Sequence, residues 1–136
     1  MAIDNTERIR KAYRDFNEGR IGEVLDALDE NIDWEEPGWL FMPRARHHGT
    51  AAVQRGVFET VPRNWDSFRI APRDLFGFGD KVLALGEFVG RLTGSGEEVH
   101  VPFAHLWTFR YGKVVKGQAF IDVSEIQSAL EQRRAA

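Results

Sequence analysis

The 136-residue chain is predicted to fold as one α+β domain, because helical and strand patterns occupy largely separate parts of its sequence. Helical spacing dominates residues 4–61, and alternation typical of strands dominates residues 68–122. Glycine-containing turns separate the strand patterns, so consecutive strands are expected to pair antiparallel. We find no repeat, linker or low-complexity segment, and therefore predict a single domain over residues 1–136.

Three helices are expected in the first half. Apolar residues at helical spacing predict helices over residues 4–19 and 21–28, which form a hairpin with a very short connection. A third helix covers residues 50–61, with Thr50 as its cap and Pro62 as its end.

Five strands are expected. The first covers residues 31–36, where alternation places Ile32, Trp34 and Glu36 on one face. A loop rich in proline and glycine follows, from residue 37 to residue 49. The other four strands cover residues 68–78, 82–92, 99–109 and 114–122, and a capping-box pattern at 124–127 predicts a short C-terminal helix.

The turn at Tyr111 and Gly112 predicts which side chains share a face of the sheet. If these two residues form the loop, His105 faces Gln118, Phe103 faces Phe120, and Val101 faces Asp122, with Trp107 on the same face. Apolar walls with a few polar groups are typical of a ligand pocket. The candidate ligand-binding residues are Tyr13, Trp34, Phe58, Phe103, Trp107, Gln118 and Phe120, and the candidate catalytic residues are Asp122, His105 and Glu36.

Alternatives remain open for the polar groups. His105 could be a core histidine hydrogen-bonded to Gln118, and Asp122 could help to cap the last helix. Glu87 is a further candidate whose face depends on the register of its strand, since a shift of one residue reverses every side chain. The opposite sheet face is small and flat, with Ala104 and Leu106, and a second subunit could cover it.

Composition excludes several classes of function. A net charge of −3 with well-mixed charges argues against nucleic acid, which requires a basic surface. Without cysteine there is no disulfide or thiolate chemistry.

No apolar run is long enough to span a membrane and no leader pattern is seen at the start, so we expect a cytoplasmic protein. Adjacent His47 and His48 make a poor metal site, and no phosphate-binding loop is present, so no metal or cofactor is expected.

Short motifs lie at residues 33–38, 48–53, 79–82, 101–107 and 112–115, and Asp122 follows them. Together they resemble the nuclear transport factor 2-like superfamily, and within it the SnoaL-like branch of polyketide cyclases and ketosteroid isomerase-like proteins. The resemblance implies a cone-shaped α+β barrel: three helices packed on a strongly curved, mixed and mostly antiparallel sheet. It also implies a homodimer formed through the outer sheet face, which includes Ala104, Leu106, Gly117 and Ala119.

The resemblance carries two enzyme templates. Glu36–Pro37 matches the Asp-Pro pair that supplies the general base of ketosteroid isomerase, and its oxyanion-hole acid falls at or beside His105. The oxyanion tyrosine falls near Ala12, so it is missing unless Tyr13 replaces it. In SnoaL-type cyclases the acid ends the last strand, as Asp122 does.

Two hypotheses follow for the function. The first is acid–base isomerisation or cyclisation of an apolar carbonyl compound (a polyketide, terpenoid or steroid-like molecule) without a cofactor. The second is a non-catalytic module that binds a ligand or dimerises. The second predicts that Asp122, His105 and Glu36 are each satisfied by internal hydrogen bonds, and the first that at least two of them line one cavity.

Overall fold

A computed structural model describes residues 4–38, 44–94, 96–124, 127–128 and 131 of the chain. The helices are α1 (Asn5–Asn17), α2 (Ile21–Asp26), α3 (Thr50–Gly56) and α4 (Val61–Asn64), with a 3-10 turn, η1 (Phe58–Thr60), between the last two. The strands are β1 (Leu28–Glu36), β2 (Ala45–His48), β3 (Trp65–Phe78), β4 (Lys81–Leu92), β5 (Glu98–Arg110) and β6 (Lys113–Ile121).

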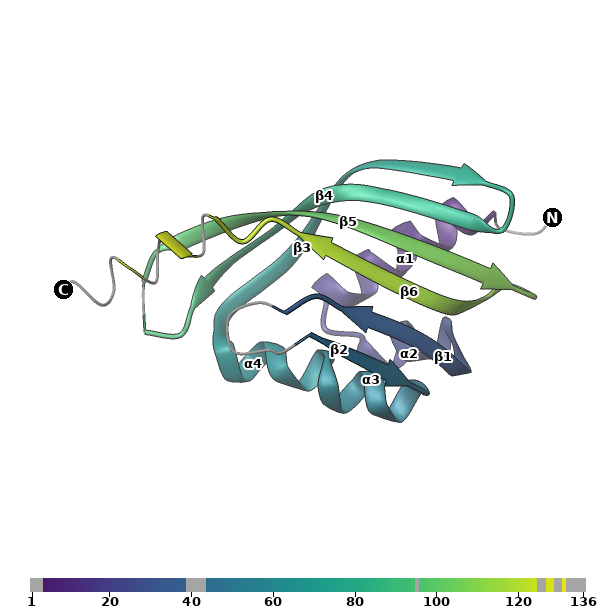
Figure 1. Cartoon of the computed structure of the whole chain (residues 1–136), viewed down its shortest axis with the longest axis horizontal. Coiled ribbons are helices and arrows are strands. Elements are labelled where there is room, and N and C mark those ends of the chain that lie inside the picture. The colour runs from purple at the N-terminus through teal and green to yellow at the C-terminus, as the bar shows by residue number, and fades with distance from the viewer. Residues whose placement is uncertain (1–3, 39–43, 95, 125–126, 129–130, 132–136) are drawn as a thin grey trace.

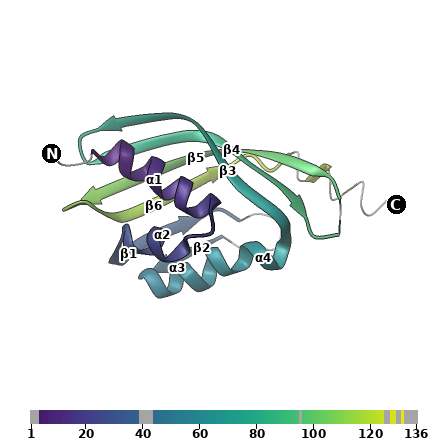
Figure 2. The same cartoon turned by 180° about the vertical axis from the view of Figure 1, so that it is seen from behind.

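The described strands form one mixed sheet in the order β2-β1-β6-β5-β4-β3. Strands β1 and β6 run parallel, and the other neighbours run antiparallel. The sheet curves strongly, α1 lies across its inner face, and α3 runs beside β1 and β2 (Figures 1 and 2). The predicted α+β class is confirmed; the sheet is an open half-cone rather than a closed barrel.

Two elements differ from their predictions. Strand β2 lies inside the segment that was expected to be a loop, where it pairs with the end of β1. The third helix is divided into α3, η1 and α4, and Pro62 lies in the first turn of α4 instead of ending a helix. A proline is tolerated there because the first turn of a helix does not use its N–H groups internally. The expected C-terminal helix falls largely outside the described residues.

Side-chain hydrogen bonds cap α1 at its start and attach its end to the sheet. The Asp4 carboxylate caps α1 by accepting from the Glu7 backbone N–H at 2.9 Å. Asn17, at the other end of α1, both donates to the carbonyl of Ile70 and accepts from its N–H, each at 2.7 Å. This pair of bonds attaches the end of α1 to the edge strand β3, and so places the inner face of α1 over the sheet.

The curvature of the sheet has identifiable causes in β3 and β4. The register between them shifts twice, with Asp66 and Arg73 as the extra residues, and such bulges increase local twist. Gly86 and Gly90 lie on the inner side of the bend. A Cβ atom at Gly86 would lie 2.4 Å from the carbonyl oxygen of Ala71, so the strands can approach this closely only with glycine there.

A third bulge corrects the predicted pairing of β5 and β6. Arg110 pairs with Lys113 as expected, but Thr108 pairs with Lys116, which leaves Val115 as an extra residue. From there on every side chain of β6 is reversed relative to the prediction. His105 therefore pairs with Ala119 rather than with Gln118, and Phe103 with Ile121 rather than with Phe120.

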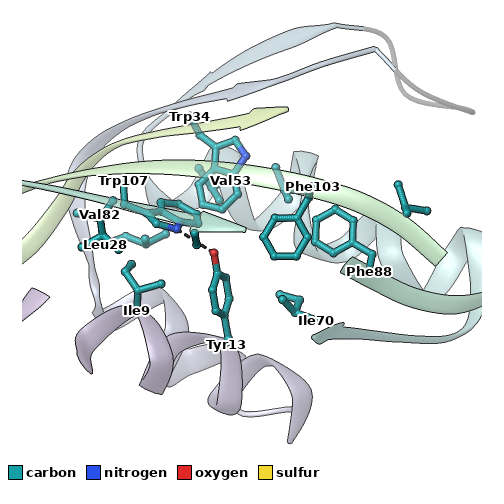
Figure 3. Close-up of a cluster of buried hydrophobic side chains, with 14 of the residues drawn as sticks. Ile9, Tyr13, Leu28, Trp34, Val53, Ile70, Val82, Phe88, Phe103 and Trp107 are labelled. Carbon is teal, nitrogen blue, oxygen red and sulfur yellow. Dashed lines mark hydrogen bonds between the residues drawn. The ribbon is translucent and has the colours of Figure 1, made fainter. Parts of the chain in front are cut away.

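The core fills the space between α1 and the inner face of the sheet (Figure 3). Its strand residues alternate along β5, where Val101, Phe103, Trp107 and Phe109 are all buried. Gly117 on β6 leaves room for two indoles, because a Cβ there would lie 2.7 Å from Trp107 and 3.3 Å from Trp34. The bulge at Val115 thus places glycine, instead of a large side chain, beneath the tryptophans.

Candidate functional site

A cavity of about 230 Å³ lies between the helices and the inner face of the sheet. Its walls are mostly aromatic and aliphatic side chains from α1, η1 and the strands, among them Phe16, Trp34, Phe58, Phe68, Phe88 and Trp107. Pockets for drug-sized ligands usually measure about 300–1,000 Å³. The volume here therefore suits a molecule of one or two rings.

Three buried polar groups form a hydrogen-bonded chain on one wall of this cavity. Trp107 Nε1–H donates to the Tyr13 hydroxyl oxygen at 3.0 Å, and that oxygen lies 2.7 Å from His105 Nδ1. Figure 3 shows the Tyr13 hydroxyl reaching from α1 toward the Trp107 indole on β5. Tyr13 (4% exposed), His105 and Trp107 (5% each) are almost completely buried, so the chain links α1 to the sheet within the core.

The bonds in this chain leave one polar hydrogen unused by the described residues. Trp107 can only donate, so the Tyr13 oxygen must accept from it. If Tyr13 donates to Nδ1, the His105 hydrogen lies on Nε2, which has no hydrogen-bond partner among the described residues. If Nδ1 donates to Tyr13 instead, the hydroxyl hydrogen of Tyr13 is the free one.

Both groups are uncharged at neutral pH. Burial lowers the pKa of His105 to about 3, because the interior does not solvate an imidazolium. Burial likewise raises the pKa of Tyr13 well above its usual value. The imidazole is also held in place by ring contacts, including a stack on Phe103 with centroids 4.2 Å apart. The wall thus presents a rigid, neutral hydrogen-bonding group.

Glu36 is an acidic group on the aromatic part of the cavity wall. Trp34 Nε1–H donates to its Oε1 at 2.6 Å, and burial raises the pKa of Glu36 to about 7 despite that bond. A carboxyl group with such a pKa is half ionised near neutral pH and can both take and return a proton. Glu36 also lines a second hollow, of about 390 Å³, near Gly38 and Arg44.

The local sequence explains why Glu36 faces inward. Alternation along β1 buries Ile32 and Trp34 and brings Glu36 to the same face, as predicted. Glu35 points the other way and pairs with Arg46 at 3.2 Å. The indoles of Trp34 and Trp107 meet edge to face, with centroids 5.1 Å apart, and so connect the Glu36 wall to the Tyr13–His105 wall.

Six of the predicted residues line the cavity together: Tyr13, Trp34, Glu36, Phe58, His105 and Trp107. Phe103 faces inward as predicted but lies behind the wall, stacked between Phe88 and His105. The alternative of a His105–Gln118 bond is wrong, because Gln118 lies on the outer face beside Leu106 and donates to Glu35 at 3.2 Å.

The other two predicted β6 side chains also lie outside the cavity. Phe120 is on the outer face and is 55% exposed. Asp122 follows the end of β6, where its Oδ1 accepts from the backbone N–H and the hydroxyl of Ser124, which holds the pKa of Asp122 below its usual range. The placement of both inside the pocket was wrong because the Val115 bulge reverses the strand. The capping alternative for Asp122 fits its contacts.

The open question about Glu87 has a clear answer in the register of β4. Glu87 pairs with Pro102 on the outer face, and it contacts His100 Nδ1 at 2.9 Å. It therefore lies away from His105 and from the cavity.

Several residues of α1, β3 and β4 line the cavity although the sequence did not predict them as ligand-binding residues. Phe16, Phe68, Ile70 and Phe88 all line the cavity. The periodicity of these segments predicted that each has a buried face. Burial alone does not distinguish a residue that faces a cavity from one that fills the core, so only the tertiary structure separates the two.

Charged residues surround one end of the cavity, between α1 and α2. Lys11 and Glu23 line it and are about half exposed, so the cavity reaches the surface there. Behind them, Asp15 is buried and accepts from Lys11 at 2.7 Å and from Arg20 at 2.8 Å, and the bond from Lys11 holds the pKa of Asp15 below its usual value. Asp15 thus joins the two helices at the rim.

Two further observations concern the part of the chain that the structure describes. No three or more histidine, aspartate or glutamate side chains are grouped there so that they could hold a metal ion. No described helix is long and apolar enough to cross a membrane.

Known proteins share both the sequence pattern and the fold. The sequence model of the SnoaL-like domain family matches residues 9–117 of this chain. No curated protein matches the sequence. An NTF2-like protein of unknown function from Burkholderia pseudomallei K96243 is 23% identical, with a TM-score of 0.81 over 93% of this chain and 98% of that one.

Two other solved structures have the same fold. TerC, co-crystallised with polyporic acid, is 23% identical, with a TM-score of 0.79 over 92% of this chain and 96% of TerC. A protein of ketosteroid isomerase-like fold from Catenulispora acidiphila DSM 44928, in complex with trimethylamine, is 13% identical, with a TM-score of 0.79 over 93% of each chain. Together with the family match over most of its length, these likenesses establish that the chain belongs to the SnoaL-like family of the NTF2-like superfamily.

Proposed function

We propose that the cavity binds a neutral, largely apolar carbonyl compound and that Glu36 and the Tyr13–His105 pair catalyse proton transfer on it. The observation that carries the proposal is a carboxyl group with a pKa of about 7 on the same apolar cavity as a buried, neutral histidine. Pairs of titratable groups whose environments separate their pKa values are typical of acid–base sites.

In the proposed proton transfer, Glu36 and the Tyr13–His105 pair each carry out one part of the reaction. The Glu36 carboxylate removes a proton from the carbon next to the ligand carbonyl. The free hydrogen of the Tyr13–His105 pair donates to the carbonyl oxygen as it gains negative charge in the enolate. Where the enolate is conjugated with a double bond, Glu36 returns the proton to the far carbon, which gives isomerisation. Alternatively the enolate carbon attacks a second carbonyl of the ligand, and the alkoxide that forms takes the proton from Glu36, which gives cyclisation.

Charge complementarity supports a neutral ligand. His105 and Tyr13 are uncharged, and the cationic side chains that line the cavity, Arg8, Lys11 and Lys113, come from α1 and the start of β6. An anionic group deep in the cavity would be desolvated without a partner there, which is costly. The same fold accepts small molecules elsewhere, since TerC was co-crystallised with polyporic acid.

Exchange of α-protons tests the catalytic step directly. 2-Tetralone, a cyclic ketone of two fused rings, is incubated with the protein in D2O, and loss of its α-proton signal is followed by NMR. Glu36→Gln should slow the exchange by at least about 100-fold, because general base catalysis typically contributes that much. Asp122→Asn is the matched control and should exchange at the wild-type rate, since Asp122 lies outside the cavity.

The non-catalytic alternative keeps one observation in its favour. Asp122, His105 and Glu36 each make a hydrogen bond inside the protein, as a simple binding module would also require. If 2-tetralone binds but wild-type protein exchanges its protons no faster than buffer, the binding role stands and the catalytic role is wrong.

A second copy of the chain is the proposed partner on the outer face of the sheet. Phe76 and Phe120 are 51% and 55% exposed there. Ala104 and Leu106 lie on this face as expected, whereas Gly117 and Ala119, which were expected there, lie on the inner face because of the Val115 bulge. Apolar patches of this kind are typical of interfaces. Sedimentation should give a dimer for wild type and a monomer for Phe120→Lys, whereas Tyr111→Lys, in the exposed turn, should leave the dimer intact.

A further inference from the structure

The Tyr13–His105 pair can present two different hydrogen-bonding patterns to the cavity at the same net charge. In the first pattern the Tyr13 hydroxyl donates to Nδ1, and the ring hydrogen lies on Nε2 of His105, whose side chain lines the cavity. In the second pattern Nδ1–H donates to Tyr13, whose hydroxyl hydrogen is then released, and Nε2 becomes an acceptor. Both patterns contain the same protons, because one hydrogen has only moved from Nε2 to Nδ1 of the same ring.

In the second pattern, Trp107 ensures that the Tyr13 hydroxyl can act on a ligand only as a hydrogen-bond donor. Its Nε1–H occupies one lone pair of the Tyr13 oxygen at 3.0 Å in either case. When Nδ1–H occupies the other lone pair, both acceptor positions of the hydroxyl are filled, and Tyr13 can act on a ligand only as a donor. Trp107 therefore acts as a positioning residue for the hydroxyl.

The surroundings hold the pair in place while its hydrogens rearrange. The imidazole stacks on Phe103 and meets the edge of Trp107 with ring centroids 5.1 Å apart, so the ring cannot turn freely. Burial opposes both an imidazolium and a phenolate. Interconversion of two neutral patterns is the rearrangement that avoids a buried charge.

On this basis, and assuming the proposed ligand pocket, we infer that Tyr13 and His105 work as one tautomeric unit that selects carbonyl ligands bearing a neighbouring hydroxyl group. The carbonyl oxygen accepts from Tyr13 O–H, and the ligand hydroxyl donates to His105 Nε2. A ketone without the hydroxyl accepts from Nε2–H alone. Hydroxyketones and enolised dicarbonyl compounds are therefore the favoured class, because they satisfy both buried groups at once.

A matched pair of probes tests the selection. 2-Hydroxyacetophenone and propiophenone have the same number of heavy atoms and differ only in a hydroxyl against a methyl group at one end. Wild-type protein should bind the hydroxyketone at least about tenfold more tightly, since a site built to bond a hydroxyl disfavours an analogue that lacks it. In Tyr13→Phe the ratio of the two affinities should fall to about twofold, because the hydroxyl that bonds the ligand carbonyl in the second pattern is gone.

The tautomer itself is read from 15N NMR of the full chain labelled at histidine, which needs no variant. The His105 ring should carry its hydrogen on Nε2 with propiophenone and on Nδ1 with 2-hydroxyacetophenone. Equal affinities, or one tautomer in both complexes, would overturn this inference and leave the proposed binding function standing. If neither ketone binds, the binding function itself is wrong, and this inference falls with it.

Discussion

Glu36 and Asp122 are two acidic residues at the ends of neighbouring strands, and their surroundings are opposite. Glu36 ends β1, faces the aromatic cavity, accepts from the Trp34 indole and has its pKa raised to about 7 by burial. Asp122 follows β6, is exposed, and has its pKa lowered by hydrogen bonds from Ser124. The difference shows that strand register, not residue type, decides which carboxyl group can serve as a base.

The largest expected effect comes from placing a charge on the face of β6 that the bulge turns inward. Gly117→Lys would place a lysine on this inner face, because Gly117 pairs with Trp107 in the observed register. We expect the free energy of unfolding to fall by at least about 4 kcal/mol, because an unpaired lysine would lie beside Trp107. Urea denaturation measures this.

The substitution Val115→Ala, at the extra residue itself, is the control for Gly117→Lys. It keeps the extra residue and truncates a half-buried side chain, so it should cost no more than about 1 kcal/mol. A Gly117→Lys variant as stable as Val115→Ala would show that residue 117 does not face Trp107.

A smaller effect is expected where the bulge places glycine under the two indoles. Gly117→Ala introduces a Cβ 2.7 Å from Trp107, and overpacking of this kind costs about 1–3 kcal/mol. Gly22→Ala, where nothing lies within 4 Å of the new Cβ, should be neutral or stabilising by up to about 1 kcal/mol. Chemical denaturation of both variants compares the two sites, and equal stabilities would contradict the packing described for Gly117.

The sequence was sufficient for the fold class and for the inner face of β1, and insufficient for β6. Alternation in β5 and β1 is unambiguous, so Trp34, Glu36 and His105 were correctly turned inward. In β6 both alternations contain apolar residues, and the turn at Tyr111 favoured the ungapped one. Lys116 was the available signal against it, because that register would have buried a lysine next to Trp107.

Other features could not be read from the chain at all. The 2.7 Å contact between Tyr13 and His105 joins residues 92 positions apart, and no local pattern encodes it. Strand β2 is only four residues long and lies in a segment with loop composition, so its pairing with β1 supplies a signal that its own sequence lacks.

The raised pKa of Glu36 should make the stability of the fold depend on pH. The pKa of Glu36 is about 7 in the folded chain and near 4.5 when unfolded, so the folded state binds more protons between these values. Stability should therefore decrease by about 1–3 kcal/mol as pH rises from 5 to 8. In Glu36→Gln that decrease should be absent, which denaturation curves at the two pH values would show. A variant that keeps the full decrease would assign it to another group.

The smallest effect is expected for Asp122. Its lowered pKa means that its carboxylate stabilises the fold above the usual aspartate range and that this contribution is lost as pH falls. Asp122→Asn should lower the melting temperature slightly at pH 7 and not at all in acid, since the group is exposed. A loss of stability as large as that of the Gly117 variant would contradict the exposed position.

The contrast between the two carboxyl groups is tested most directly by a side-chain 13C NMR titration of the ligand-free protein. We predict a midpoint of about 7 for Glu36 and one below the usual aspartate range for Asp122. A Glu36 midpoint near 4.5 would mean that its carboxyl group is solvated, and it would contradict the assignment of Glu36 as the base of the cavity.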